Sequence, residues 1–275
     1  MGPPGGMGCR GAAVAVGMGD RLAEAATGVI NLDTGVAATT DSLFQIGSVT
    51  KVWTAALVMQ LVAEGLVDLD EPVRRYLPEF GVLDAAASAS ITVRQLLSHT
   101  GGFDGDLFED TGRGDDAVDK LVAFMRGNAR QVSGPGELFS YCNAGYCALG
   151  ALVARLRGRT WEAATRELLI EPLGARHMAL YAEEAIMFRA AVGHVGDPPR
   201  VSPRRLLPQS NALGRVHAGR GGARPRAVRA DAAGRRRGGR RDAGAARGDL
   251  RRDVLGRRSR CRGWAGGTRR PGVSG

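Results

Sequence analysis

The composition of this chain changes abruptly after residue 212, and this change limits where a packed fold can lie. Residues 213–275 contain 19 Arg, four Asp and no Lys, with almost no Leu, Ile, Phe or Tyr at helical or strand spacing. Such a segment buries too little apolar surface to offset its chain entropy. We therefore expect residues 213–275 to be a disordered Arg/Gly-rich tail, and the folded domain to lie within residues 11–212.

The positive charge of the chain lies in this tail. The whole chain carries +10 and residues 213–275 carry +15, which leaves −5 for residues 1–212. Charge alone permits an Arg/Gly-rich tail to bind RNA or DNA. However, Trp264 is its only aromatic residue for base stacking, and the Arg-Gly-Gly spacing is irregular. We therefore expect no specific nucleic-acid partner.

Several other protein classes are disfavoured. No stretch approaches the ~20 consecutive apolar residues of a membrane span. Met1–Arg10 is rich in Gly and Pro and lacks the apolar run of a signal peptide, so we expect a disordered N-terminus and a cytoplasmic location. Four cysteines show no C-x-x-C pair and no His at ligand spacing, which disfavours a structural metal or a disulfide framework: Cys9, Cys142, Cys147 and Cys261. No glycine-rich phosphate loop follows a strand, so we expect no cofactor.

Residues 11–212 have the pattern of a mixed fold that begins with strands. Gly11–Val16 and Ala23–Asn31 are small or β-branched runs that can pair about a turn near Gly19-Asp20. Gly47–Gly65 is predicted to be a long helix that ends at Gly65. This segment is apolar on almost every side, which predicts a buried central helix.

Further helices are expected along the rest of this region. Thr92 can cap a short helix through Ser98, and Asp115 or Asp116 can start another that runs to Gly127. Two more helices are predicted after these, the second closed by Glu171-Pro172: Asn143–Arg157 and Thr160–Ile170.

An S-x-x-K tetrad, Ser48-Val49-Thr50-Lys51, lies at the start of the apolar helix. Residues three apart share a helix face, so the Lys51 ammonium can reach Ser48 Oγ. A serine needs a neighbouring base to become a nucleophile, and desolvation fits a lysine for such a relay. The helix N-terminus also favours a developing oxyanion. The alternative is a capping serine beside a solvated lysine.

The surroundings of this tetrad carry a resemblance to a known family. Phe44–Lys51, Gly65–Val73 and Tyr76-Leu77-Pro78 resemble the nucleophile region of class C β-lactamases, family VIII carboxylesterases and related penicillin-binding proteins. Leu96–Gly102 and Glu171–Gly174 resemble later segments of the same serine β-lactamase-like family, in the same order. The resemblance covers nearly all of residues 11–212. It implies an α+β fold of the β-lactamase and transpeptidase type, with an incomplete antiparallel sheet flanked by helices and an all-helical lobe from about Leu66 to Val201.

The family has a second catalytic element, Y-x-N, which is Tyr141-Cys142-Asn143 here. Positions two apart on an extended segment point the same way, so Tyr141 and Asn143 can face one cleft. The resemblance implies that Tyr141, as phenolate, takes the proton of Ser48, while Lys51 lowers the pKa of Tyr141. Asn143 would hold Lys51 and a substrate carbonyl or amide. The alternative is a buried tyrosine and a helix cap at Asn143.

Other reactive side chains are given structural roles. His99 lies at a predicted helix end and is interpreted as structural rather than as a base. His177 and His194 lie in the predicted helical region without an acidic partner at a telling spacing. Cys142 is expected to point away from the cleft into the core.

A third family element, a K-T-G or H-x-G strand, has no convincing counterpart in residues 213–275. Read one nucleotide later, with Arg as CGN and Leu as CTN, Arg224–Arg236 can encode D-L-A-R-F-A-R-M-x-L-A-G-G. Arg240–Ala245 can likewise encode D-G-T-R-V-L, and both resemble the helix and loop that follow in family members. We therefore expect a one-base frameshift between about Gln209 and Gly214. We also expect a longer true N-terminus, since the family begins with a helix before its first strand.

The resemblance implies a serine hydrolase that acts on a small ester, amide or β-lactam through a Ser48 acyl-enzyme. We expect this activity to be weak in the present chain, because the third element supplies the second oxyanion N–H. The alternative is a non-catalytic binding protein with the same fold. Substrate choice, folding stability and oligomeric state do not follow from the sequence.

Overall fold

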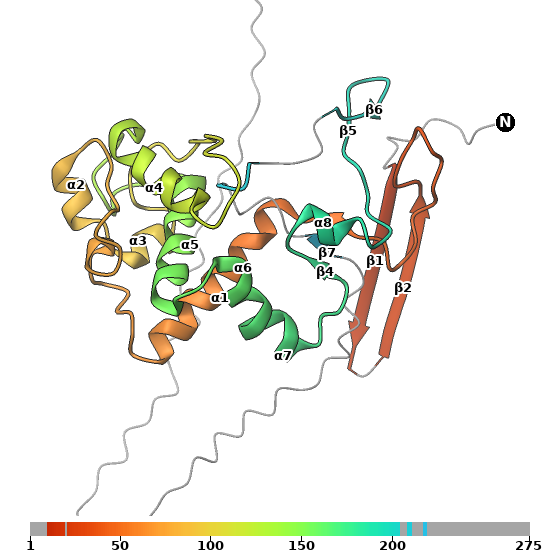
Figure 1. Cartoon of the computed structure of the whole chain (residues 1–275), viewed down its shortest axis with the longest axis horizontal. Helices are drawn as coiled ribbons and strands as arrows, with labels where there is room; N and C mark the ends of the chain where they lie inside the picture. Colours follow the sequence, from red (N-terminus) through yellow and green to blue (C-terminus); the bar gives the residue numbers. More distant parts are fainter. Residues whose placement is uncertain (1–9, 20, 204–207, 211–216, 219–275) are drawn as a thin grey trace, which may run out of the picture. The chain divides into compact units, whose positions relative to one another are not determined.

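A computed structural model describes residues 10–19, 21–203, 208–210 and 217–218, drawn in colour in Figure 1. The chain divides into two units, Met1–Val228 and Arg229–Gly275, and all described residues belong to the first. Of the tail predicted to begin at residue 213, only two residues are described. These two, His217 and Ala218, form a strand, so the predicted disorder does not hold there. The rest of the predicted tail and residues 1–9 of the predicted disordered N-terminus lie outside the described residues, and the frameshift stays a prediction.

The predicted N-terminal strand pair is confirmed. Strands β1 (Gly11–Met18) and β2 (Arg21–Gly28) pair antiparallel, with a register that runs from Gly11 opposite Gly28 to Met18 opposite Arg21. Gly19 has a φ of +57° in the turn between them, a conformation that glycine adopts without steric cost. The turn falls where the sequence predicts it.

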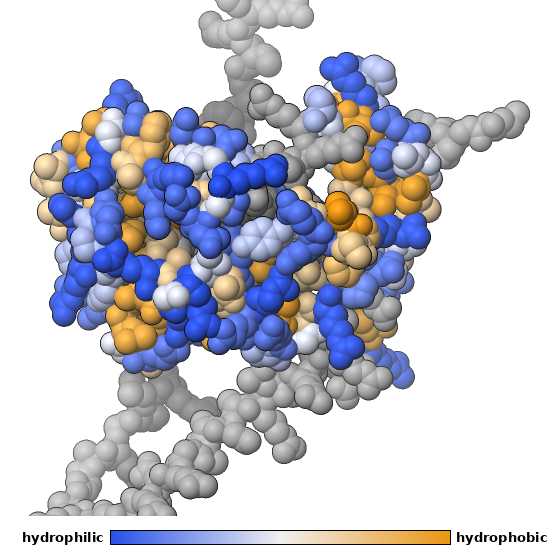
Figure 2. Space-filling model, viewed as in Figure 1, coloured by the Kyte–Doolittle hydropathy of each residue, from blue (hydrophilic) through white to orange (hydrophobic). Residues whose placement is uncertain are grey.

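This hairpin carries apolar side chains that remain in solvent. Val14, Val16 and Met18 alternate along β1 and therefore share one face, and they are 58%, 62% and 74% exposed. Apolar residues are visible on the surface over this hairpin in Figure 2. Among the described residues, the two strands form a sheet of their own. The pair thus has the apolar face of a larger sheet, as an incomplete antiparallel sheet predicts.

The predicted long helix is also present. A 3-10 turn (Gly47–Val49) leads into α1 (Thr50–Ala63), and Gly65 follows its end with a φ of +74°. The side of α1 that contains Leu57 and Leu61 is completely buried and the helix packs against α5. The prediction of burial on all sides is wrong in part, because Val52 is 68% and Met59 is 45% exposed. Apolar composition indicates which faces can be buried, whereas burial itself depends on which elements pack there.

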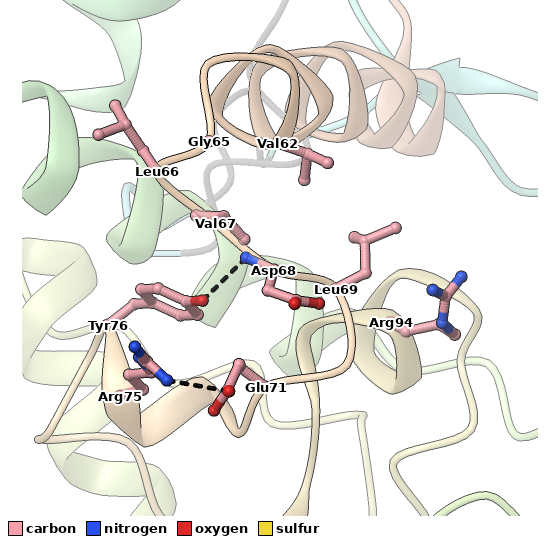
Figure 3. A pocket seen from close by; sticks show the side chains of 10 residues that line it. All are labelled: Val62, Gly65, Leu66, Val67, Asp68, Leu69, Glu71, Arg75, Tyr76 and Arg94. Carbon is pink, nitrogen blue, oxygen red and sulfur yellow. Dashed lines mark hydrogen bonds and ion pairs between the residues drawn. The ribbon is translucent and has the colours of Figure 1, made fainter. Parts of the chain in front are cut away.

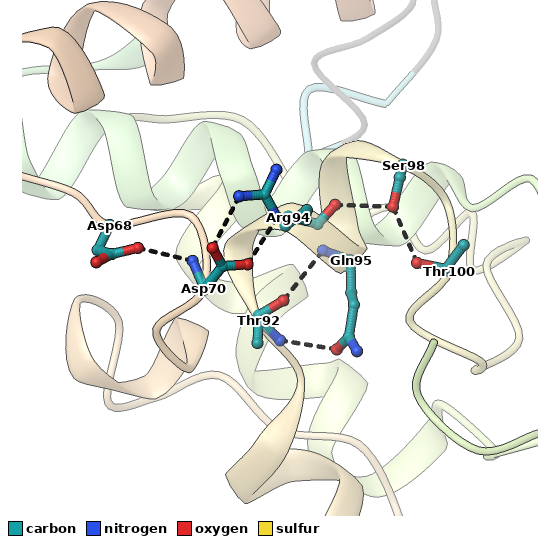
Figure 4. A network of polar contacts seen from close by, with 7 residues as sticks. All are labelled: Asp68, Asp70, Thr92, Arg94, Gln95, Ser98 and Thr100. Carbon is teal, nitrogen blue, oxygen red and sulfur yellow. Dashed lines mark hydrogen bonds and ion pairs between the residues drawn. The ribbon is translucent and has the colours of Figure 1, made fainter. Parts of the chain in front are cut away.

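Two short helices follow. Helix α2 (Ala85–Ser90) begins at Asp84, and α3 (Val93–Leu97) begins at Thr92. As predicted, Thr92 caps α3: its Oγ1 accepts from the Gln95 N–H at 3.2 Å, and its own N–H donates to Gln95 Oε1 at 3.0 Å (Figure 4). This reciprocal capping box fixes the start of α3. The end of α3 therefore has a defined position, and so does His99, which lies just after it.

Helices α4 (Ala117–Asn128) and α5 (Asn143–Arg157) agree with their predicted ranges to within a residue or two. The two helices pack on each other, and α5 also contacts α1, α3 and α6. It is therefore the central helix of the core. The fully buried large side chains from these and neighbouring elements include Phe80, Ile91, Leu96, Phe103, Leu121, Met125, Leu149 and Leu152.

The next helix does not end where the sequence predicts. Helix α6 (Trp161–Thr165) continues through a π-helical turn (Arg166–Ile170) into α7 (Glu171–Leu173), so Pro172 lies within the helical run. Proline lacks an N–H and cannot bond the carbonyl four residues earlier. That carbonyl, of Leu168, instead accepts from Gln60 Nε2 at 3.4 Å. The predicted stop at Glu171-Pro172 is therefore wrong, and the helical run ends at Gly174 with a φ of +63°.

The remaining elements are short. They comprise one 3-10 turn (Val73–Arg75), one helix, α8 (Ala182–Ala185), and five two-residue strands: β3 (Phe44–Gln45), β4 (Met178–Ala179), β5 (His194–Val195), β6 (Arg200–Val201) and β7 (His217–Ala218). Strand β7 pairs antiparallel with both β3 and β4, and β5 pairs with β6. Within the described residues, no helix is long and apolar enough to cross a membrane.

Core packing around α1 gives a first test. Leu57→Ala should lower the free energy of unfolding by about 2–5 kcal/mol, because it removes buried methyl groups and leaves a cavity between α1 and its neighbours. Met59→Ala, two residues along the same helix but exposed, should change it by no more than about 0.5 kcal/mol. Urea unfolding of both variants measures this difference. Equal destabilisation by the two variants would contradict the orientation of α1.

Candidate active site

The S-x-x-K serine and lysine lie together at the start of α1. Ser48 is in the 3-10 turn that precedes the helix and is exposed, whereas Lys51, in the first turn of α1, is only 6% exposed. Lys51 Nζ donates to Ser48 Oγ at 3.2 Å and to Asn143 Oδ1 at 2.7 Å. The side chain of Lys51 is thus held by two oxygen acceptors rather than solvated, contrary to the alternative of a solvated lysine.

The start of α5 presents Asn143 to this lysine. The sequence allows Asn143 to be the helix cap, but the cap is Cys142, whose Sγ accepts from the Gly145 N–H at 3.2 Å. Asn143 is consequently the first residue of the helix, and its side chain is free to point at Lys51. The capping interpretation of Asn143 is wrong, because the neighbouring thiol already satisfies the helix N–H group.

A residue that sequence analysis did not single out orients Asn143. Asn143 Nδ2 donates to Asp106 Oδ1 at 2.8 Å. Because an ionised carboxylate only accepts hydrogen bonds, the amide nitrogen must face Asp106, and the amide oxygen then faces Lys51. Asp106 lies 37 residues before Asn143 in an irregular loop, where no periodicity marks it.

Backbone packing brings that loop to α5. The carbonyl of Gly105 accepts from the Ala144 N–H at 2.9 Å. A Cβ on Gly105 would lie 2.4 Å from the Cα of Cys142, so only glycine allows this approach. The glycine between two aspartates is the one local signal in the sequence for Asp106.

Tyr141 lies beside the same ammonium group. Lys51 Nζ is 4.6 Å from the centroid of the Tyr141 ring, and Tyr141 is 45% exposed, so it is not a buried tyrosine. Partial burial raises the pKa of Tyr141, but hydrogen bonding to Lys51 and Ser48 and the positive charge of Lys51 outweigh it. The pKa of this phenol is consequently below its ordinary value. The structure thus brings four predicted residues together around the Lys51 ammonium: Ser48, Lys51, Tyr141 and Asn143.

The other predicted residues lie as follows. His99 is buried next to this site and follows Ser98, the residue that caps the end of α3. His177 stacks on Phe188, whereas His194 lies in strand β5, which corrects its predicted helical setting. Cys142 is 4% exposed and packs in the core as predicted, and burial raises the pKa of its thiol to about 11. Such a thiol is protonated and unreactive at neutral pH.

An open surface pocket of about 560 Å³ lies elsewhere, where α1 ends near Gly65 (Figure 3). Its guanidinium groups already have partners: Arg75 pairs with Glu71 at 2.9 Å and Arg94 pairs with Asp70 at 2.6 Å. None of the residues that line it is a serine, cysteine or lysine. This pocket therefore offers no nucleophile with a base beside it. Within the described part of the chain, no group of His, Cys, Asp and Glu is placed to hold a metal ion.

Comparison with known proteins identifies the family of this chain. The model of the family described as Beta-lactamase matches residues 4–267, which is most of the chain. The chain belongs to the Beta-lactamase family. The match extends beyond residue 212, where we placed the end of the folded domain. The fold is that of the β-lactamases and transpeptidases, as the resemblance implied.

Individual relatives of this Beta-lactamase family member include hydrolases. It is 45% identical over 211 residues to penicillin-binding protein 4 of Amycolatopsis lactamdurans, covering 75% of this chain and 55% of the relative. It is 34% identical over 199 residues to esterase EstB of Burkholderia gladioli, covering 68% and 50%. A crystal structure of SurE aligns with a TM-score of 0.63 at 32% identity, covering 76% of this chain and 47% of that one. The chain thus spans about half the length of the relatives that it matches.

The electrostatics of the site predict the order in which the tyrosines ionise. In an ultraviolet titration, Tyr141 should ionise below the ordinary range of a tyrosine, whereas burial raises the pKa of Tyr146 and Tyr181. Tyr141→Phe should remove the early transition. Lys51→Met should move it to higher pH, because the ammonium no longer stabilises the phenolate.

Tyr181→Phe is the matched control for this titration, since it removes a phenol that ionises late. An early transition that persists in Tyr141→Phe would show that Lys51 does not act on this phenol.

Proposed function

We propose that Ser48 is the nucleophile of an acyl-transfer site and that this chain is a serine hydrolase of its family. The contact of Lys51 Nζ with Ser48 Oγ at 3.2 Å carries this proposal, together with the Tyr141 phenol, which hydrogen-bonds to both side chains. A serine hydroxyl becomes a strong nucleophile when a base lies next to it. The lowered pKa of Tyr141 makes its phenolate available as that base.

The reaction proceeds in two acyl transfers. As Ser48 Oγ attacks the substrate carbonyl carbon, its proton passes to the Tyr141 phenolate. The carbonyl π electrons move to the oxygen, which the positive end of α1 stabilises. When the tetrahedral intermediate collapses, the bond to the leaving oxygen or nitrogen breaks and that atom takes the proton from Tyr141. Water then repeats the attack on the Ser48 ester and releases the acid.

Lys51 and Asn143 keep the site ready for these steps. The Lys51 ammonium contacts both Ser48 and the Tyr141 ring and favours the phenolate by its charge. Asn143 fixes Lys51 through Oδ1 while Asp106 holds its amide nitrogen. We propose that the Asn143 side chain also holds a substrate carbonyl or amide. These fixed dipoles need little reorganisation when the reaction occurs.

The proposed substrates are small esters, amides or β-lactams. The names of the relatives support this class, because they include an esterase and a penicillin-binding protein. No metal ion or organic cofactor takes part in the proposed steps. We expect slow turnover by this chain, because the sequence after residue 212 gives no convincing counterpart of the family's third element. His217-Ala218-Gly219 matches H-x-G in its letters, but the strand there, β7, spans only two residues. Loss of one oxyanion donor typically lowers the rate by ~10²–10³.

The second candidate is a binding protein that retains the fold without turnover. The same absence of a third sequence element favours it. The two candidates differ in whether Ser48 becomes acylated, since a binding protein would hold the ligand without forming a covalent bond.

Covalent labelling tests the proposed nucleophile. The chain incubated with a fluorescent β-lactam should gain one label per molecule, on the peptide that contains Ser48, and should hydrolyse a small chromogenic ester. Ser48→Ala should abolish both signals. Lys51→Met should lower the labelling rate by ~10²-fold or more, because Tyr141 loses the charge that favours its phenolate.

Ser98→Ala is the control, because Ser98 is also an exposed serine beside a helix end but has no lysine contact. It should label like the wild type. Folded protein that takes no label, or Ser48→Ala that labels as fast as the wild type, would favour the binding protein.

A further inference from the structure

His99 lies directly behind the candidate base, in a conformation that few residues adopt. It follows α3, is 9% exposed and has a φ of +60°, the only positive φ at a non-glycine position among the described residues. Histidine, asparagine and aspartate are the side chains best tolerated there. A buried residue in this conformation must be held by its surroundings.

The contacts of His99 hold the chain on both sides of Tyr141. The carbonyl of His99 accepts from the Ser140 N–H at 2.8 Å, and its Nδ1 accepts from the Cys142 N–H at 3.0 Å. These are the N–H groups immediately before and after Tyr141. Because a backbone N–H only donates, Nδ1 must be unprotonated in this arrangement.

The imidazole ring also fills the space between aromatic side chains. Its centroid is 4.5 Å from that of Tyr141 at 33°, and 5.0 Å from that of Tyr146 at 34°. The Phe139 ring lies edge to face with the imidazole, with 5.8 Å between the two ring centroids. His99 thus contacts four consecutive residues, Phe139 to Cys142, with its ring, its Nδ1 or its carbonyl.

The groups that face this imidazole favour its neutral form. They are the Lys51 ammonium from α1, the two tyrosine rings, and the backbone N–H of Cys142 at the start of α5. Burial lowers the pKa of His99 most, and the Lys51 charge lowers it further. Nδ1 accepts the hydrogen bond of Cys142 only while it is unprotonated, so this bond also favours the neutral form. A second positive charge here would oppose Lys51 and lose the Cys142 hydrogen bond.

We propose that His99 is a positioning residue of the acyl-transfer site, holding Phe139–Cys142 so that the Tyr141 phenol stays beside Lys51 and Ser48. The imidazole fixes the backbone through Cys142 and the ring of Tyr141 by stacking, whereas it touches no reacting atom. This role rests on the proposed function, because the place of the phenol matters to the rate only if Tyr141 is the base.

The test compares two substitutions that differ in one contact. His99→Asn retains a side-chain acceptor at the place of Nδ1 and tolerates a positive φ, whereas His99→Leu retains apolar volume without an acceptor. His194→Leu is the matched control, because His194 Nε2 likewise accepts a backbone N–H, that of Leu32 at 3.1 Å, away from the site.

Three measurements on the full chain make the test. The rate of Ser48 labelling by a fluorescent β-lactam should fall ~10–10²-fold in His99→Leu, as for a misplaced catalytic group, with little change in the concentration that half-saturates it. His99→Asn should stay within about tenfold of the wild type and His194→Leu should match it. In the ultraviolet titration, His99→Leu should raise the pKa of Tyr141, because the phenol moves away from Lys51.

The pH dependence adds a readout that a packing role would not move. In the wild type, the labelling rate should fall more steeply once the pH drops below the lowered pKa of His99, where the imidazole takes a proton. This steeper fall should be absent in His99→Asn, which cannot take that proton.

Two results would overturn the proposal for His99. One is His99→Leu that is folded and equals the wild type in labelling rate and in the pKa of Tyr141. The other is a labelling rate that falls with decreasing pH in His99→Asn as steeply as in the wild type. This variant remains informative if His99→Leu does not fold. Absence of labelling in the wild type is a different failure, that of the proposed function, and the Tyr141 titration would still report whether His99 positions the phenol.

Discussion

The buried ammonium group of Lys51 is the constraint on which the rest of the site depends. Burial of a charged group costs several kcal/mol unless hydrogen bonds and nearby charge compensate for lost hydration. Among the described residues Lys51 forms no ion pair, and its compensation comes from Ser48 Oγ, from Asn143 Oδ1 and from the faces of two tyrosine rings. Cation–π contact with such rings is most favourable where water is excluded. The helix that carries the serine, the helix that carries the asparagine and the tyrosine between them are therefore held in one geometry.

Each partner of Lys51 is in turn fixed by a neighbour. Cys142 caps α5 and leaves Asn143 for the lysine, while Asp106 decides which way its amide points. His99 holds the backbone on both sides of Tyr141. Asp106 and His99 lie in loops that pack closely against α5. This close packing explains why Gly105 has no room for a side chain. The geometry of the site thus depends on how three segments that are distant in the sequence pack together, and not on the S-x-x-K tetrad alone.

The sequence predicts local elements and the candidate site residues better than it predicts the side chains that hold those residues in place. Capping at Thr92, the stop at Gly65 and the bounds of α5 follow from local chemistry and are confirmed. The stop at Pro172 is wrong because a distant Gln60 compensates for the missing N–H. Asp106 has no signal of its own, because its partner lies 37 residues away and its loop has no period. The cap at Cys142 escapes prediction because a thiol is an uncommon substitute for the usual capping oxygens.

The most direct test of the central claim is a crystal structure of this protein after reaction with a β-lactam. We predict one covalent adduct on Ser48 Oγ, with Lys51 Nζ within hydrogen-bond distance of that oxygen and of Asn143, and with the Tyr141 hydroxyl facing the adduct. An adduct on another side chain would contradict the account. So would an acylated Ser48 from which Lys51 and Tyr141 are turned away into separate surroundings.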